Sequence, residues 1–162
     1  MVAGRRIGTV SERGQTLIEF ALVAPLALFF LLAIVDFGIA IDRRLVLDHA
    51  VREGARYASV GKTQGEVEDR TAAQSQGIAD PNGAVGSASY IEVCYENING
   101  GVLGDKGEDV QVRVHYRHDF VTGFTGLIDS GMLNIPMNPK ASARLETDLV
   151  ATPTPCGSWP PP

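Results

Sequence analysis

The stretch Arg13-Gly14-Gln15-Thr16-Leu17-Ile18-Glu19-Phe20, followed by an apolar run that reaches Val35, decides the fold of this chain. Phe20 to Val35 contains no charged side chain, and as a helix it rises about 24 Å. A hydrocarbon core about 30 Å thick needs about 20 such residues, and the longer segment from Leu17 to Ile41 supplies them. We therefore predict a transmembrane helix. A buried core helix is the alternative, but such helices carry a polar face and this run has none.

Two residues inside the predicted span need a physical account. Pro25 has no backbone N–H, so the carbonyl of Ala21 loses its helical partner. We expect a mild kink there, which membrane helices tolerate. Glu19 is a carboxylate in an apolar helix, where a charge costs about 2.5–3.5 kcal/mol at the bilayer centre and less near an interface. Glu19 either lies among the lipid headgroups or pairs with a cation. If the chain is cut after Gly14, the new α-amino group of Gln15 is one helical turn away.

Gly14 followed by Glu19 and an apolar helix resembles the processing site of type IV prepilins. The fuller string from Arg13 to Leu26 resembles the TadE-like family of the tight-adherence (Tad) pilus system. The resemblance continues through Asp36-Phe37-Gly38 and through Ala50-Val51-Arg52-Glu53-Gly54-Ala55-Arg56-Tyr57-Ala58. It departs from many type IV pilins in having Gln15, where those carry Phe or Met just after the cut.

The resemblance implies a minor pseudopilin that acts by helix packing rather than by catalysis. Its implied partners are the prepilin peptidase, other Tad pilus subunits, the secretion platform and membrane lipid. It also implies that the chain is a single-pass protein of the cytoplasmic membrane, with its C-terminal domain outside the cytoplasm and in some cases part of a surface pilus. The short basic flank before the span agrees with this orientation. Arginines lie on both sides of the span, so the positive-inside rule alone does not decide the orientation.

The charge of the chain excludes one class of partner. The 162 residues carry a net charge of −5, and removal of residues 1–14 takes away three arginines and one glutamate, which leaves −7. An acidic exported domain offers no electrostatic attraction to nucleic acid.

We predict an α+β fold in which a long N-terminal helix precedes a small antiparallel sheet, as in pilins. The expected segments follow the composition of the chain. They are a leader (1–14), a transmembrane helix (15–41), an amphipathic extension of that helix (42–61), an extracytoplasmic α+β domain (62–150) and a proline-rich tail (151–162).

Within the long helix, Ala50, Gly54 and Ala58 recur every four residues and form a stripe of small side chains. Small residues allow close approach of a second element. The stripe packs either on the chain's own domain or on a neighbouring molecule, and both contacts can use different faces. Pro25 and Gly38 are further candidates for helix packing in the apolar half.

Two segments of the domain alternate apolar and polar residues. Tyr90–Glu96 and Val110–Arg117 are separated by a glycine-rich loop, which predicts an antiparallel hairpin. Ala141–Val150 is a weaker strand candidate, and residues 62–78 are compatible with a short helix around 65–76. Residues 120–139 mix aromatic residues, glycine and proline, and we expect no regular structure there.

Cys94 and Cys156 are the two cysteines of the chain. In an oxidising compartment they are candidates for one disulfide, which would pin the tail and its Trp159 to the strand that holds Cys94. Two free thiols are the alternative.

We find no sequence motif for catalysis, for a metal or for another cofactor. GxSxG, HExxH and phosphate-binding loops are absent. His115 and His118 are three residues apart and face opposite sides of a regular strand, so they would share a metal only if the strand bends. Arg113, His115 and Arg117 lie on one strand face, which is either solvated or a modest anion-binding surface. The protein is therefore not predicted to be an enzyme.

A second functional class remains open at this point. A cleaved signal peptide would release the domain as a secreted binding module, and retention of the apolar segment would tether it. Against cleavage, the apolar segment is over-long for a signal peptide and Gly38-Ile39-Ala40 is a poor cleavage site.

Overall fold

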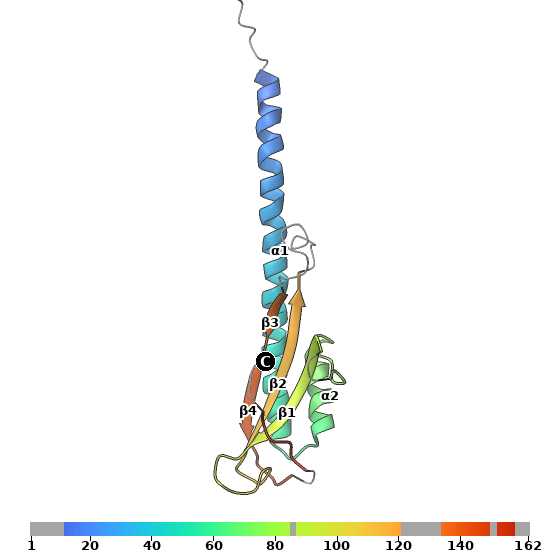
Figure 1. The fold of residues 1–162 in the computed structure, drawn as a ribbon, viewed down its shortest axis with the longest axis vertical. Coiled ribbons are helices and arrows are strands. Elements are labelled where there is room, and N and C mark those ends of the chain that lie inside the picture. Colours follow the sequence, from blue (N-terminus) through green and yellow to red (C-terminus); the bar gives the residue numbers. More distant parts are fainter. Residues whose placement is uncertain (1–11, 85–86, 121–133, 150–151, 158–162) are drawn as a thin grey trace, which may run out of the picture.

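The computed structural model describes residues 12–84, 87–120, 134–149 and 152–157. It is an α+β protein in which one long helix, α1 (Glu12–Ala58), carries a small domain on its C-terminal half (Figure 1). The other elements are α2 (Gln64–Gln74), β1 (Ser89–Glu96), β2 (Asp109–Asp119), β3 (Asn134–Met137) and β4 (Lys140–Arg144). The predicted fold class is confirmed.

Helix α1 is 47 residues long and therefore rises about 70 Å. It runs from the apolar half into the amphipathic half, as the sequence predicted, and Pro25 lies inside it. The helix ends at Ala58, and Gly61 closes the turn that follows, with a φ of +76° and its N–H donating to the carbonyl of Ala58 at 3.0 Å. A left-handed conformation at this point favours glycine.

The predicted hairpin is confirmed. Strands β1 and β2 pair antiparallel with Val93 opposite Val112, and β2 extends two residues beyond the predicted end. On its other edge β2 pairs with both β3 and β4, which follow one another along that edge. The sheet is therefore built around β2.

Strand β3 lies in a region that we expected to be irregular, and that expectation was wrong for residues 134–137. Asn134 and Pro136 are poor strand formers, so the sequence gives little sign of this strand. Pairing with the end of β2 imposes it, and Pro136 is tolerated because a short edge strand does not require every N–H. Strand β4 ends at Arg144 rather than continuing to Val150. The rest of the expected irregular segment, 121–133, lies outside the described residues.

The core forms where the amphipathic half of α1 packs on one face of the sheet. Leu47, Val51 and Ala55 of the helix are buried against alternate residues of the strands. The strand residues are Ile91, Val93 and Tyr95 of β1 and Val110, Val112 and Val114 of β2. This is the face that the alternation of the two strands predicted. Helix α2 closes the domain beside α1, with Val67 and Thr71 buried.

Candidate functional site

The start of α1 contains the predicted processing residues. The helix begins at Glu12, so the Gly14–Gln15 bond lies within its first turn. The side-chain amide of Gln15 donates to a carboxylate oxygen of Glu19 at 3.1 Å, one turn further along. Space is open around Gly14, because a Cβ built there meets no atom within 4 Å. Residues 1–11 of the predicted leader lie outside the described residues.

The apolar half of α1 makes no core in this molecule. Most of its large hydrophobic side chains from Leu17 to Val35 are exposed, and Leu22 and Ile34 each expose more than 70% of their area. Within the described residues, one helix is long and apolar enough to cross a membrane, and it is this one (Gly14–Ala58). Such a length of exposed apolar helix is unstable in water and calls for a lipid or protein environment.

At the junction between the apolar half of α1 and the domain lies a polar cluster that the sequence analysis did not find. Asp36 and His118 are almost fully buried there. The guanidinium of Arg43 donates to the hydroxyl of Tyr116 and lies 3.1 Å from Nδ1 of His118. Phe37 packs edge-to-face on Phe120, with ring centroids 5.9 Å apart. Together these contacts hold the end of β2 against α1.

The electrostatics of the cluster favour a neutral His118. Burial lowers the pKa of the His118 imidazole, and the nearby Arg43 lowers it further, while Asp119 and Asp36 act in the opposite direction. A sequence signal was available, because Asp36 and Arg43 are seven residues apart and so share a helix face. His118 also has the same strand parity as Val112, Val114 and Tyr116.

The small-residue stripe packs on the chain's own domain. Ala50, Gly54 and Ala58 are all buried. A Cβ on Gly54 would collide with Oγ1 of Thr71 in α2 and lie 3.2 Å from Val112 in β2. Glycine therefore lets α1, α2 and β2 meet at one point. By contrast, space is open around Gly38 in the apolar half.

Glu53 joins α1 to α2. Its carboxylate accepts hydrogen bonds from Arg56 at 2.9 and 3.0 Å and from Arg70 of α2 at 3.1 Å. These bonds hold the pKa of Glu53 at about 2, with the bond to Arg56 as the largest cause. Hydrogen bonds to the charged form stabilise it relative to the neutral carboxyl.

The tail is part of the sheet. A disulfide joins Cys94 of β1 to Cys156, and next to it Tyr95 donates to the carbonyl of Thr154 at 2.9 Å and accepts from the N–H of Cys156 at 3.1 Å. The tail thus extends the outer edge of β1 in the parallel direction. Trp159 lies outside the described residues.

The tail also covers part of a strand face that we expected to be solvated or anion-binding. Arg113 is only 5% exposed, donates to the carbonyl of Gly157 at 3.0 Å and lies 3.7 Å from the carboxylate of Glu92. His115 stacks on Tyr90, with ring centroids 5.1 Å apart. The Arg113 guanidinium and the His115 ring, which an anion would need, are therefore already engaged within the chain. At Arg113 this strand face stabilises the fold.

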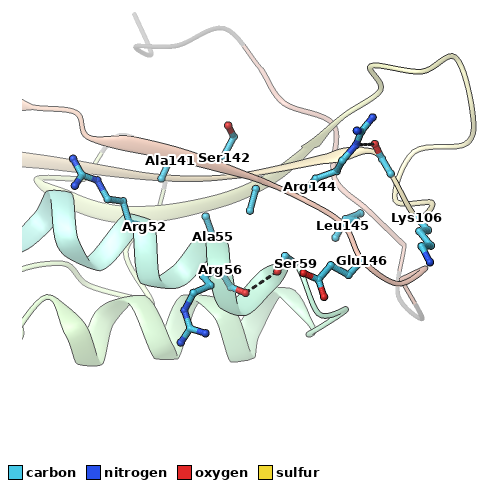
Figure 2. Close-up of a pocket in the computed structure, with 12 residues that line it drawn as sticks. Arg52, Ala55, Arg56, Ser59, Lys106, Ala141, Ser142, Arg144, Leu145 and Glu146 are labelled. Atoms are coloured by element: carbon cyan, nitrogen blue, oxygen red, sulfur yellow. Dashed lines mark hydrogen bonds between the residues drawn. The ribbon is translucent and has the colours of Figure 1, made fainter.

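A groove opens on the other side of the domain, between α1 and β4 (Figure 2). It encloses about 1100 Å³ and is lined by small residues and by several cations. Within the described residues, no group of three or more His, Cys, Asp or Glu side chains is placed to hold a metal ion.

Residues 14–56 match the family model described as TadE-like protein. The resemblance seen in the sequence is thereby confirmed over this segment. The TadE-like segment covers the apolar half of α1 and most of the half that packs on the domain. No curated protein and no solved structure matches the chain significantly. The TadE-like segment and the exposed apolar helix fit a Tad pilus-associated membrane protein.

Proposed function

We propose that this chain is a minor pseudopilin of a Tad-type pilus, anchored in the cytoplasmic membrane with its domain on the extracytoplasmic side. The observation that carries the proposal is the exposed apolar half of α1, which lies inside the TadE-like segment and continues directly into the packed domain. A prepilin peptidase cuts after Gly14, and the retained helix then packs among other Tad pilus subunits and the secretion platform. The protein acts by association, and its helix packing uses the part of α1 that its own domain leaves uncovered.

The first test is the N-terminus of the mature protein. Mass spectrometry of the chain purified from native membranes should find Gln15 as the first residue. Gly14→Leu should leave the full-length chain, because the residue before the cut is changed, whereas Gly8→Leu in the same leader should be processed normally. A mature chain that starts at any other residue contradicts the processing claim, and a product free in the medium that starts after Ala40 favours the alternative of a released binding module.

The second test addresses Glu19. In the uncut chain its carboxylate accepts from the Gln15 side chain, and after cleavage it is one turn from the new ammonium, which is a stronger partner for a charge in lipid. Glu19→Ala should leave cleavage intact but sharply reduce pilus assembly, measured by electron microscopy of surface pili. Glu12→Ala is the matched control, since Glu12 leaves with the leader. Normal piliation of the Glu19→Ala strain would remove the role of this carboxylate in assembly.

A further inference from the structure

The groove between α1 and β4 has a floor of small side chains and a basic rim. Ala55 of α1 and Ala141 and Ala143 of β4 form the floor, and the outer edge of β4 has no strand partner among the described residues. Figure 2 shows Arg52 at one end of the groove, with Arg144 and Lys106 at the other. Such a shape accepts the surface of another element without steric conflict.

The charges on the rim are largely uncompensated. Arg52 and Lys106 form no ion pair with an acid among the described residues, and Glu146 is the one acid that lines the groove. Arg144 also forms no ion pair there, but its guanidinium donates to the carbonyl of Gly107 at 2.8 Å (Figure 2). Arg56, the fourth cation, is already paired with Glu53. In a chain whose net charge is −5, this is a local excess of positive charge. An acidic partner surface would complement it.

The same molecule presents an acidic surface on its opposite side. On α2, Asp69 is exposed beside Gly65 and Ala73, which are small, and it forms no ion pair among the described residues. Glu66 is exposed on the same helix, but its carboxylate accepts from Thr63 and lies 4.0 Å from the ammonium of Lys62. Arg70, the one basic residue of this helix, is occupied by Glu53. In Figure 1, α2 and β4 flank α1 on opposite sides of the domain. They lie at the same height along the rod, because Gly54 of α1 touches Thr71 of α2 while Arg52 and Ala55 line the groove.

We propose that the groove of one molecule docks the outer face of α2 from a second copy of this chain. The inference rests on the membrane anchoring in the proposed function, because parallel anchoring sets both surfaces at one height above the bilayer. Individual exposed ion pairs are weak, but confinement of both copies to one membrane raises their effective concentration. The contact joins two different surfaces, so repeated use of it builds a row or an open helical filament unless the rotation closes into a ring.

Cysteine cross-linking in native membranes tests the contact, since both natural cysteines are already in a disulfide. Two differently tagged full-length copies are co-expressed, one with Ala73→Cys on α2 and one with Ala143→Cys on the groove floor. Mild oxidation should give a mixed dimer. Two controls should give little product, namely the pairing of Ala143→Cys with itself and the pairing of Ala73→Cys with Ile98→Cys, which lies on the β1–β2 loop.

Charge reversal then tests the electrostatic part. Arg52→Glu with Lys106→Glu in the groove copy should lower the yield of the mixed dimer roughly five- to tenfold, and Asp69→Lys in the α2 copy should restore most of it. Absence of the mixed dimer from chains that remain in the membrane fraction overturns the docking but leaves the anchoring intact. Equal yields from the control pairs overturn it as well. A mixed dimer from chains outside the membrane fraction supports the docking and contradicts the proposed function.

Discussion

At the scale of single residues, Gly54 is a position where the fold leaves no room for a side chain. The site brings three elements into contact, and the side chain of Thr71, which donates to the carbonyl of Val67 at 2.7 Å, fills the space that a Cβ would need. Gly54→Ala gains helix propensity, worth about 1 kcal/mol, but overpacking costs typically 1–3 kcal/mol. We expect a net destabilisation of up to about 2 kcal/mol, measured by chemical unfolding of the chain in detergent.

Two variants separate this collision from a general effect of alanine. Gly65→Ala in α2 meets no atom within 4 Å and should be neutral or stabilising by up to about 1 kcal/mol. Thr71→Ala removes the colliding hydroxyl, so Gly54→Ala should cost less in that background than alone. If Gly54→Ala is as harmless as Gly65→Ala, the close approach of α1 and α2 is not as the structure describes it.

The lowered pKa of Glu53 predicts that the stability of the fold depends on pH. Its pKa is lowered from 4.5 to about 2 in the folded chain, so its contribution to stability is fully present above about pH 4.5 and is lost as the pH falls towards 2. Thermal unfolding in detergent should therefore show a fall in melting temperature between pH 4.5 and 2. Glu53→Gln should make the fall in melting temperature shallower, whereas Glu146→Gln, which changes an exposed carboxylate away from Arg56 and Arg70, should leave it unchanged. If the melting temperature falls equally steeply with pH in Glu53→Gln and in the wild-type chain, Glu53 is not the source of this pH dependence.

At the scale of secondary structure, what the sequence predicts depends on whether an element carries its own pattern. The apolar run gives α1, and the alternation of Tyr90–Glu96 and Val110–Arg117 gives the hairpin with the correct core face. Strand β3 and the paired tail carry no such pattern in their sequences. Their conformation is imposed by pairing with neighbouring strands, β2 for β3 and β1 for the tail. The burial of Arg113 under the tail follows from the tail's position, and so it was missed for the same reason.

Among the candidate site residues, the stripe at Ala50, Gly54 and Ala58 was found from its spacing, but spacing alone left open which surface it meets. The cluster of Asp36, Arg43 and His118 was missed because its members come from two elements whose register is known only once β2 lies on α1. Residue types and intervals within an element are visible in a sequence, whereas pairs across elements depend on packing.

The disulfide gives a prediction about the tail as an element. In the chain-entropy model, closing a loop of 62 residues stabilises the fold by about 4 kcal/mol. Cys94→Ser with Cys156→Ser should therefore unfold at a clearly lower urea concentration. Hydrogen exchange should report the tail itself, since the Tyr95 N–H bonded to Thr154 should lose protection.

The reducing agent provides the control for the disulfide prediction. Reduction of the wild-type chain should lower its stability to that of the double serine variant, and the variant should not respond to the same treatment. Equal stability of the oxidised and reduced wild-type chain would mean that the tail strand is held by its backbone bonds and packing alone.

At the scale of the whole molecule, the chain divides into an apolar rod and a domain that completes its own core. Helix α1 belongs to both, and the boundary falls near Asp36, which is the first strongly buried residue along it. The core cluster begins at Ala40, and among the described residues it includes none before Asp36. The insolubility expected of the full chain should therefore reside in residues 15–35, and the fold in the remainder.

A fragment that begins at Asp36 tests this division. It keeps the cluster of Arg43, Tyr116 and His118, the core and the disulfide, so an oxidised preparation should be soluble, folded by circular dichroism and cooperative in unfolding. A matched fragment that begins at Ala21 retains exposed apolar helix and should need detergent. If the shorter fragment is unfolded or aggregates like the longer one, the apolar half of α1 contributes to the fold, and the membrane anchor and the domain are a single unit.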